Sequence, residues 1–135
     1  MILGIGSDLV DVNRIKTAYE RFGERFLDKI FTPREREYAF NQPRPERAFA
    51  KRFAAKEALV KALGSGFRGG LSWQEMEVVN DVLGKPSFAL SGRTLQALQE
   101  KTPYGHQSQI DLSLSDDYPY ALAFIVISAN PTGEG

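Results

Sequence analysis

Two carboxylates stand in sequence settings that suit a hard, oxygen-binding cation. Asp8 ends an apolar stretch in which Gly4 and Gly6 share its face, and Glu57 lies on a long predicted helix. The chain has no cysteine and a single histidine, so its sequence does not support a zinc site. Magnesium commonly binds one or two carboxylates, with water and substrate phosphates as further ligands. Asp8 and Glu57 are therefore the candidate metal ligands.

Both carboxylates also have a purely structural interpretation. Asp8 or Asp11 could cap the N-terminus of the following helix, which explains Asp8 as well as metal binding does. Glu57 and Lys61, four residues apart, could form only a surface ion pair of about 0.3–0.5 kcal/mol. However, apolar neighbours such as Phe53 place Glu57 at the edge of the buried side of its helix. A carboxylate in that position needs a nearby cation.

The basic residues form two groups. Arg14, Arg21 and Arg25 fall within about 40° of one another on a helix predicted over 12–26. Most such rows are simply solvated, but the like-charge pair of Arg21 and Arg25 costs about 0.2–0.5 kcal/mol, which an acidic partner would relieve. A second group, close to Lys61 in sequence, could hold several phosphates: Arg44, Arg47, Lys51 and Arg52.

The elements that must position these residues follow from hydrophobic periodicity and turn residues. Alternation predicts a first strand that carries Asp8 on the same face as two glycines. Thr32 and Glu35 have the spacing of a capping box at a helix start. The predicted helices are 12–26, 33–41, 45–63 and 91–101, and the predicted strands are 2–9, 71–79, 87–90, 107–115 and 120–128. Helices and strands do not alternate strictly, which favours an α+β fold over a doubly wound sheet.

Composition limits the size, partners and compartment of the protein. The 135 residues fit one domain over 1–129, followed by a tail over 130–135 that we expect to be loose. The 17 basic and 17 acidic side chains cancel, so bulk charge favours neither a nucleic acid nor a membrane partner. The apolar N-terminus reaches Asp8 too soon for a signal sequence or a membrane span. Because the chain has no cysteine, we expect a reducing compartment and a cytoplasmic protein.

Two segments together form a specific pattern. The first is Gly4-Ile5-Gly6-Ser7-Asp8-Leu9-Val10 followed by Arg14-Ile15, and the second is Lys51-Arg52-Phe53-Ala54-Ala55-Lys56-Glu57-Ala58 followed by Lys61-Ala62 and Gly64. Their order and separation, with Gly84-Lys85-Pro86 and the closing strands, resemble the holo-acyl-carrier-protein synthase family, the short trimeric type of 4'-phosphopantetheinyl transferase. The resemblance covers the chain up to its tail. It implies an α+β domain in which a curved, mostly antiparallel sheet packs on a long central helix.

The resemblance also implies an activity, a cofactor and partners. The implied enzyme is a Mg²⁺-dependent transferase that moves 4'-phosphopantetheine from coenzyme A to a serine of apo acyl carrier protein, leaving adenosine 3',5'-bisphosphate, for fatty acid biosynthesis. It would act as a homotrimer with active sites at the subunit interfaces. The implied catalytic residues are Asp8, Glu57 and Lys61, of which the carboxylates bind the metal and the lysine binds phosphate. Contacts to coenzyme A fall on Arg44, Arg52, Lys61, Gly64 and Pro86, and contacts to the carrier protein fall on Arg14, Arg21 and Arg25.

One position departs from the pattern of this family. Many members have a histidine after Ser-x-Ser, near the 3'-phosphate of coenzyme A, whereas Ser115 is followed here by Asp116. An acid cannot replace that contact, so the 3'-phosphate must be held from elsewhere, for example by Arg44 or Arg47. Two rival functions stay open, a non-catalytic nucleotide-binding module and a metal-dependent phosphohydrolase. The paired carboxylates argue against the first, because simple binding does not require a metal pair.

Overall fold

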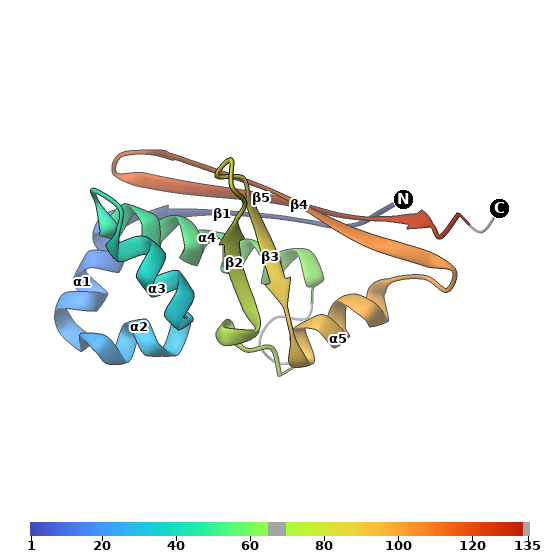
Figure 1. The fold of residues 1–135 in the computed structure, drawn as a ribbon, viewed down its shortest axis with the longest axis horizontal. Helices are drawn as coiled ribbons and strands as arrows, with labels where there is room; N and C mark the ends of the chain where they lie inside the picture. The colour runs from blue at the N-terminus through green and yellow to red at the C-terminus, as the bar shows by residue number, and fades with distance from the viewer. Residues whose placement is uncertain (65–69, 134–135) are drawn as a thin grey trace.

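The structure is a computed structural model that describes residues 1–64 and 70–133. In chain order the elements are β1 (Ile2–Asp11), α1 (Val12–Phe22), α2 (Glu24–Ile30), α3 (Pro33–Phe40), α4 (Pro45–Leu63), the short 3-10 helix η2 (Trp73–Glu75), β2 (Met76–Asn80), β3 (Pro86–Leu90), α5 (Gly92–Lys101), β4 (His106–Asp117) and β5 (Tyr120–Pro131). Three strands form an antiparallel sheet in the order β1-β5-β4, and β2 pairs with β3. The helices lie on one side of the three-stranded sheet (Figure 1). This arrangement confirms the α+β class and the antiparallel sheet.

The long helix α4 packs directly on β1 because two glycines remove the side chains between them. A Cβ added to Gly6 would lie 1.9 Å from the carbonyl oxygen of Ala58, and one added to Gly4 would lie 2.1 Å from that of Ala62. The glycines of the first motif therefore admit the backbone of a helix. Asp8 follows them on the same face of β1, as the alternation predicts.

The core is built around α4. Its small residues, including Ala54 and Ala58, are fully buried, so the helix can lie close to its neighbours. Gly64 ends α4 in the left-handed conformation with φ 84°, which glycine adopts without steric cost. The capping box predicted at Thr32 and Glu35 is present at the start of α3. The sequence thus predicts both of these helix ends correctly.

Several predicted elements are wrong in their limits. The helix expected over 12–26 ends at Phe22, because Gly23 takes φ 62° and its N–H donates to Tyr19 O. Arg25 consequently lies on α2. The strand expected over 71–79 begins only at Met76, since Ser72 caps the 3-10 turn that precedes it. The last strand also runs further than its expected end at 128, as its pairing with β4 continues to Pro131.

Candidate active site

The structure brings Asp8 and Lys61 together at the free edge of β1. The Lys61 ammonium donates to Asp8 Oδ1 and to the Ser7 carbonyl oxygen, both at 3.0 Å. Asp11, and not Asp8, caps α1, because its Oδ1 accepts from the Asn13 backbone N–H at 2.9 Å. The capping interpretation of Asp8 is therefore wrong. Its carboxylate faces the flank of α4.

Glu57 completes this group from the next turn of α4. Burial raises the pKa of the Glu57 carboxyl, the negative charge of Asp8 raises it further, and the positive charges of Arg14 and Lys61 oppose both. Two carboxylates that repel each other beside water-accessible space form a favourable place for a divalent cation. Within residues 1–64 and 70–133 no group of three or more histidine, cysteine or acidic side chains is arranged so that it could hold a metal ion. The pair nevertheless fits Mg²⁺, which takes its remaining ligands from water and phosphate.

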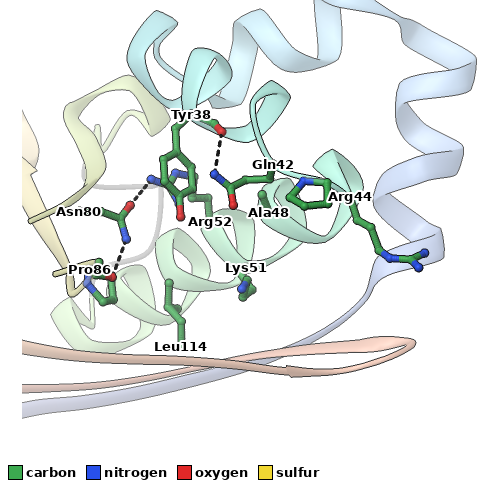
Figure 2. Close-up of a pocket in the computed structure, with 11 residues that line it drawn as sticks. Tyr38, Gln42, Arg44, Ala48, Lys51, Arg52, Asn80, Pro86 and Leu114 are labelled. Atoms are coloured by element: carbon green, nitrogen blue, oxygen red, sulfur yellow. Dashed lines mark hydrogen bonds between the residues drawn. The ribbon is translucent and has the colours of Figure 1, made fainter. Parts of the chain in front are cut away.

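A second group of predicted residues lines a cavity of about 350 Å³ (Figure 2). Arg52 is buried there, where its guanidinium donates to Asn80 Oδ1 at 2.6 Å and lies 3.9 Å from the centroid of the Tyr38 ring. Burial lowers the pKa of Arg52, and nearby negative charge, mainly that of Glu35, partly opposes the effect. The lining residues are Tyr38, Gln42, Pro43, Arg44, Ala48, Lys51, Arg52, Asn80, Gly84, Pro86 and Leu114. The cavity is thus a cationic pocket whose volume falls within the range of small-molecule binding sites.

The two groups lie on opposite flanks of α4. Nine residues separate Arg52 from Lys61, which at 100° per residue is about two and a half turns, so their side chains leave α4 in opposite directions. The sheet register agrees, because Asp8 pairs with Ala123 and Ala123 pairs with Leu114, which places the carboxylate and the pocket at opposite edges of the sheet. The described lining of the pocket includes none of the metal-site residues. The candidate metal ligands and the cationic pocket therefore do not meet within one chain.

The predicted docking arginines occupy two helices instead of one. The Arg14 guanidinium lies 5.7 Å from the centroid of the Phe53 ring, and that of Arg21 lies 5.1 Å from the centroid of the Phe22 ring. Arg25 lines another cavity, of about 450 Å³, beside Phe53. Because α1 ends before Arg25, the expected like-charge pair across one helical turn is wrong. Each of the three cations still lies beside an aromatic side chain.

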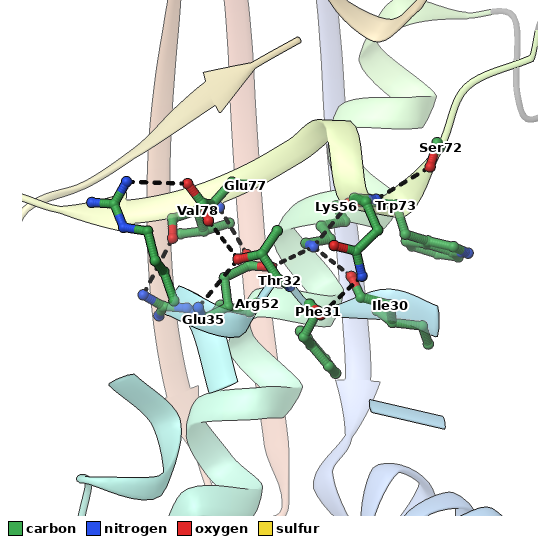
Figure 3. Close-up of polar contacts among 12 residues, drawn as sticks. Ile30, Phe31, Thr32, Glu35, Arg52, Lys56, Ser72, Trp73, Glu77 and Val78 are labelled. Carbon is green, nitrogen blue, oxygen red and sulfur yellow. Dashed lines mark hydrogen bonds and ion pairs between the residues drawn. The ribbon is translucent and has the colours of Figure 1, made fainter. Parts of the chain in front are cut away.

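Sequence reasoning missed a buried polar network around Lys56 (Figure 3). The Lys56 ammonium is fully buried and donates to Ile30 O and Glu35 Oε1, both at 2.6 Å, and to Trp73 O at 3.0 Å. Glu35 also accepts from the Val78 N–H at 2.8 Å, so one ion pair ties α4 to α2, α3 and β2. Burial lowers the pKa of Lys56, and Glu35 partly opposes the effect.

A periodicity signal for Lys56 was present in the sequence. The residue lies seven positions after Phe49 and seven before Leu63, so all three fall on one side of α4. Phe49 and Leu63 are both buried. A lysine in register with two core residues must find a buried acid, which the structure supplies as Glu35.

A family model matches the sequence over most of its length. The 4'-phosphopantetheinyl transferase superfamily matches residues 4–123. The chain belongs to this superfamily. The holo-[acyl-carrier-protein] synthase of Rhodopseudomonas palustris (strain BisA53) is 51% identical over 137 residues, covering 98% of this chain and 99% of the relative. The family recognised from the paired motifs is thereby confirmed.

Solved members of the 4'-phosphopantetheinyl transferase superfamily share the fold. The holo-[acyl-carrier-protein] synthase of Neisseria meningitidis superposes with a TM-score of 0.84 at 39% identity, over 95% of this chain and 99% of that one. The Helicobacter pylori synthase, solved in complex with coenzyme A, gives a TM-score of 0.77 at 28% identity, over 92% of this chain and 99% of that one. Among the described residues, no helix is both long and apolar enough to span a membrane.

Proposed function

We propose that this protein transfers 4'-phosphopantetheine from coenzyme A to a serine of apo acyl carrier protein, as a step that serves fatty acid biosynthesis. The observation that carries the proposal is the group at the free edge of β1, where Lys61 and Asp8 are bonded beside the half-buried Glu57. Relatives about half identical to this chain are holo-[acyl-carrier-protein] synthases, and solved relatives bind coenzyme A. Both facts support the same reaction.

Asp8 and Glu57 would hold the Mg²⁺ ion, which when bound neutralises charge on the pyrophosphate of coenzyme A. Lys61 has three N–H donors, and two of them already bond to Asp8 and the Ser7 carbonyl. The third is left for a phosphate oxygen of the substrate. A lysine fixed in this way adds positive charge at a defined place without reorganisation during the reaction.

The bond changes follow from the substrates. The carrier serine oxygen bonds to the phosphorus that bears the pantetheine arm, while the bond from that phosphorus to the bridging oxygen breaks. Adenosine 3',5'-bisphosphate leaves, and the serine proton passes to a base. Positioning and fixed charge supply most of the rate in such phosphoryl transfers.

Coenzyme A would extend from this group, past Gly64 at the end of α4, into the cationic pocket, with contacts there at Arg44, Arg52 and Pro86. Because the two halves lie on opposite flanks of α4, we propose that a neighbouring subunit provides the pocket. The outer face of the sheet supports such assembly: Ile5 and Leu9 are about three-fifths exposed, and Leu122 pairs with Leu9 beside Phe124. An apolar patch of this kind on a sheet is typical of an interface.

A homotrimer with active sites between neighbouring subunits would account for the separation of the two groups across α4 and for the exposed apolar face of the sheet. Its test is complementation. Asp8→Ala and Arg44→Ala variants, each deficient alone, should regain transfer when they are co-expressed and co-purified, because some interfaces then combine two intact halves. Absence of recovery in a mixed oligomer would place the whole site within one subunit.

Carrier docking would use Arg14, Arg21 and Arg25 against acidic side chains of the carrier protein. Arg14 and Arg25 are exposed beside aromatic rings, so their guanidinium groups can reach carboxylates of a bound partner. The absence of cysteine supports a reducing compartment. We therefore propose a cytoplasmic enzyme.

The deciding experiment measures the intact mass of apo acyl carrier protein after incubation with this protein, coenzyme A and Mg²⁺. We expect a gain of one phosphopantetheine group, abolished by a chelator and by either Asp8→Ala or Glu57→Ala. Release of product from coenzyme A without carrier would instead indicate a phosphohydrolase. Tight coenzyme A binding with no mass gain on several carrier proteins would indicate a non-catalytic module.

A further inference from the structure

The cavity beside Arg25 depends on how α2 is placed against its neighbours. The helix α4 contributes Phe53 to the lining of this cavity, and η2 contributes Trp73, whose ring stacks on that of Phe53. Most of the remaining lining belongs to α2: Arg25, Phe26, Lys29 and Ile30. Arg25 therefore keeps its place at the cavity only if α2 is held in a fixed position relative to α4 and η2.

The helix α2 cannot fix its own direction. It has seven residues and begins directly after Gly23, which has no side chain to cap it and which takes φ 62° where the chain leaves α1. A helix of this length is not stable by itself and depends on the contacts at its ends. Its last carbonyl groups also lack hydrogen-bond partners within the helix. The C-terminal end of α2 must therefore be held by another part of the chain.

Gln74 of η2 holds that end. Its side-chain amide donates to the Asp28 carbonyl oxygen at 2.7 Å and to the Phe31 carbonyl oxygen at 2.9 Å. Both N–H donors of the amide are thus used on the backbone at the end of α2. Gln74 is itself exposed, so this contact lies at the surface and outside the core.

Lys56 ties the same two segments together from the inside. Its buried ammonium donates to the carbonyl oxygens of Ile30 and Trp73, the residues next to Phe31 and Gln74 (Figure 3). The two side chains differ in what their loss would do. Removing Lys56 opens the core, whereas removing the amide of Gln74 loosens only the outer edge of the contact between α2 and η2.

We propose that Gln74 is a positioning residue for the carrier protein. It fixes the end of α2 against η2, so that Arg25 is held at the cavity where the carrier docks. The inference rests on the proposed function, and in particular on docking through the arginines. Gln74 should not affect the chemical step, because Asp8, Glu57 and Lys61 lie on β1 and α4, which the glycines of β1 bring into direct contact.

Steady-state transfer by a Gln74→Met variant tests the assignment. Methionine has nearly the same length and no charge, but it lacks the two N–H donors. We expect the KM for the carrier protein to rise about five- to tenfold, because two hydrogen bonds are lost. The kcat and the Kd for coenzyme A should change less than about twofold, since only the docking of the carrier is weakened. Gln96→Met, the same change on an exposed position of α5, should match wild type in all three values.

A double-mutant cycle tests whether Gln74 acts through Arg25. Arg25→Ala removes the side chain that Gln74 is proposed to place. In that background Gln74→Met should raise the KM for the carrier less than about twofold further, because residues that act as a unit are not additive. If the two increases multiply in full, Gln74 does not act through Arg25 and the proposed role is wrong.

Two other results would overturn the inference. An unchanged KM for the carrier in Gln74→Met would mean that Lys56 and the core hold α2 without this amide. A fall in kcat as large as the fall in kcat/KM, with KM unchanged, would mean that Gln74 supports the fold as a whole and has no particular role in docking.

Binding of the apo carrier without coenzyme A, measured by calorimetry, separates this inference from the proposed function. A wild-type protein that modifies the carrier, together with a Gln74→Met variant that binds the carrier equally well, would refute the role of Gln74 and leave the transferase intact. A wild-type protein that binds the carrier but never modifies it, with weaker binding in Gln74→Met, would keep the positioning role and refute the transferase.

Discussion

Replacing Gly6 with alanine tests the link between the packing of α4 and the reaction. An ideal Cβ at Gly6 would lie 1.9 Å from the Ala58 carbonyl oxygen and 2.9 Å from the Ala62 nitrogen. Carbon and oxygen atoms approach no closer than about 3.3 Å even in weak C–H···O contacts. The helix must therefore move away from β1 by more than about 1 Å, since both atoms belong to its backbone.

The expected cost has two opposing parts. Overpacking of this kind costs about 1–3 kcal/mol of unfolding free energy. Alanine also restricts the unfolded chain more than glycine does, which stabilises the folded state by about 0.4–1 kcal/mol. We expect a net loss of about 1–2 kcal/mol. Because Glu57 and Lys61 move with α4 while Asp8 stays on β1, a misplacement of about 1 Å should reduce the transfer rate about 100-fold.

Urea unfolding followed by circular dichroism measures the first effect, and the intact-mass assay measures the second. A net loss of that size shifts the urea midpoint by about 0.5–1 M. Ser7→Ala is the stability control, because it changes the adjacent residue on the outer face of β1, away from α4. If Gly6→Ala matched wild type in both urea midpoint and transfer rate, the close contact between α4 and β1 would not be what positions Asp8, Glu57 and Lys61.

Three further predictions test other parts of the structure. Glu35→Gln should lower the unfolding free energy by about 3 kcal/mol, because it leaves buried Lys56 without its counter-ion, and adding Lys56→Met should restore part of the loss in the same urea assay. The folded protein raises the pKa of Glu57, so a proton competes with the metal for this carboxylate at higher pH than it would for a free glutamate. Mg²⁺ affinity measured by calorimetry should therefore fall as the pH is lowered through that pKa. Arg14→Gln should move this fall to higher pH, because the charge of Arg14 lowers the pKa of Glu57. Raising the salt from about 0.05 to 0.5 M should raise the KM for the carrier protein more than that for coenzyme A, and equal effects would contradict docking through the arginines.

Local patterns predicted much of the fold. The capping box at Thr32 depends on residues three positions apart, and the end of α4 depends on a single glycine, so short-range chemistry decides both. The alternation in β1 placed Asp8 beside the glycines for the same reason. The break at Gly23 was not predictable in this way, because a glycine within a helical pattern can be tolerated or can end the helix. Tertiary packing makes that choice.

The candidate site was predictable as a set of residues but not as an arrangement. Motif spacing identified Asp8, Glu57 and Lys61, and the nine residues from Arg52 to Lys61 put these two side chains on opposite sides of the predicted helix. The spacing does not show what each side of the helix meets, because that depends on how the sheet covers α4. The ion pair between Lys51 and Asp116, whose charged atoms lie 3.4 Å apart, is also a long-range contact, so the sequence alone indicated only that an acid stood where a cation was expected.

The stack of Trp73 on Phe53 gives the protein a built-in optical reporter. Trp73 is the chain's one tryptophan, its ring lies 5.4 Å from that of Phe53 at an interplanar angle of 22°, and it borders the cavity that Arg25 lines. Indole emission changes with the polarity and charge around the ring. A carrier protein that binds over this cavity would exclude water from the indole and change its fluorescence. Docking could then be followed in real time on unlabelled protein, before any chemical step begins.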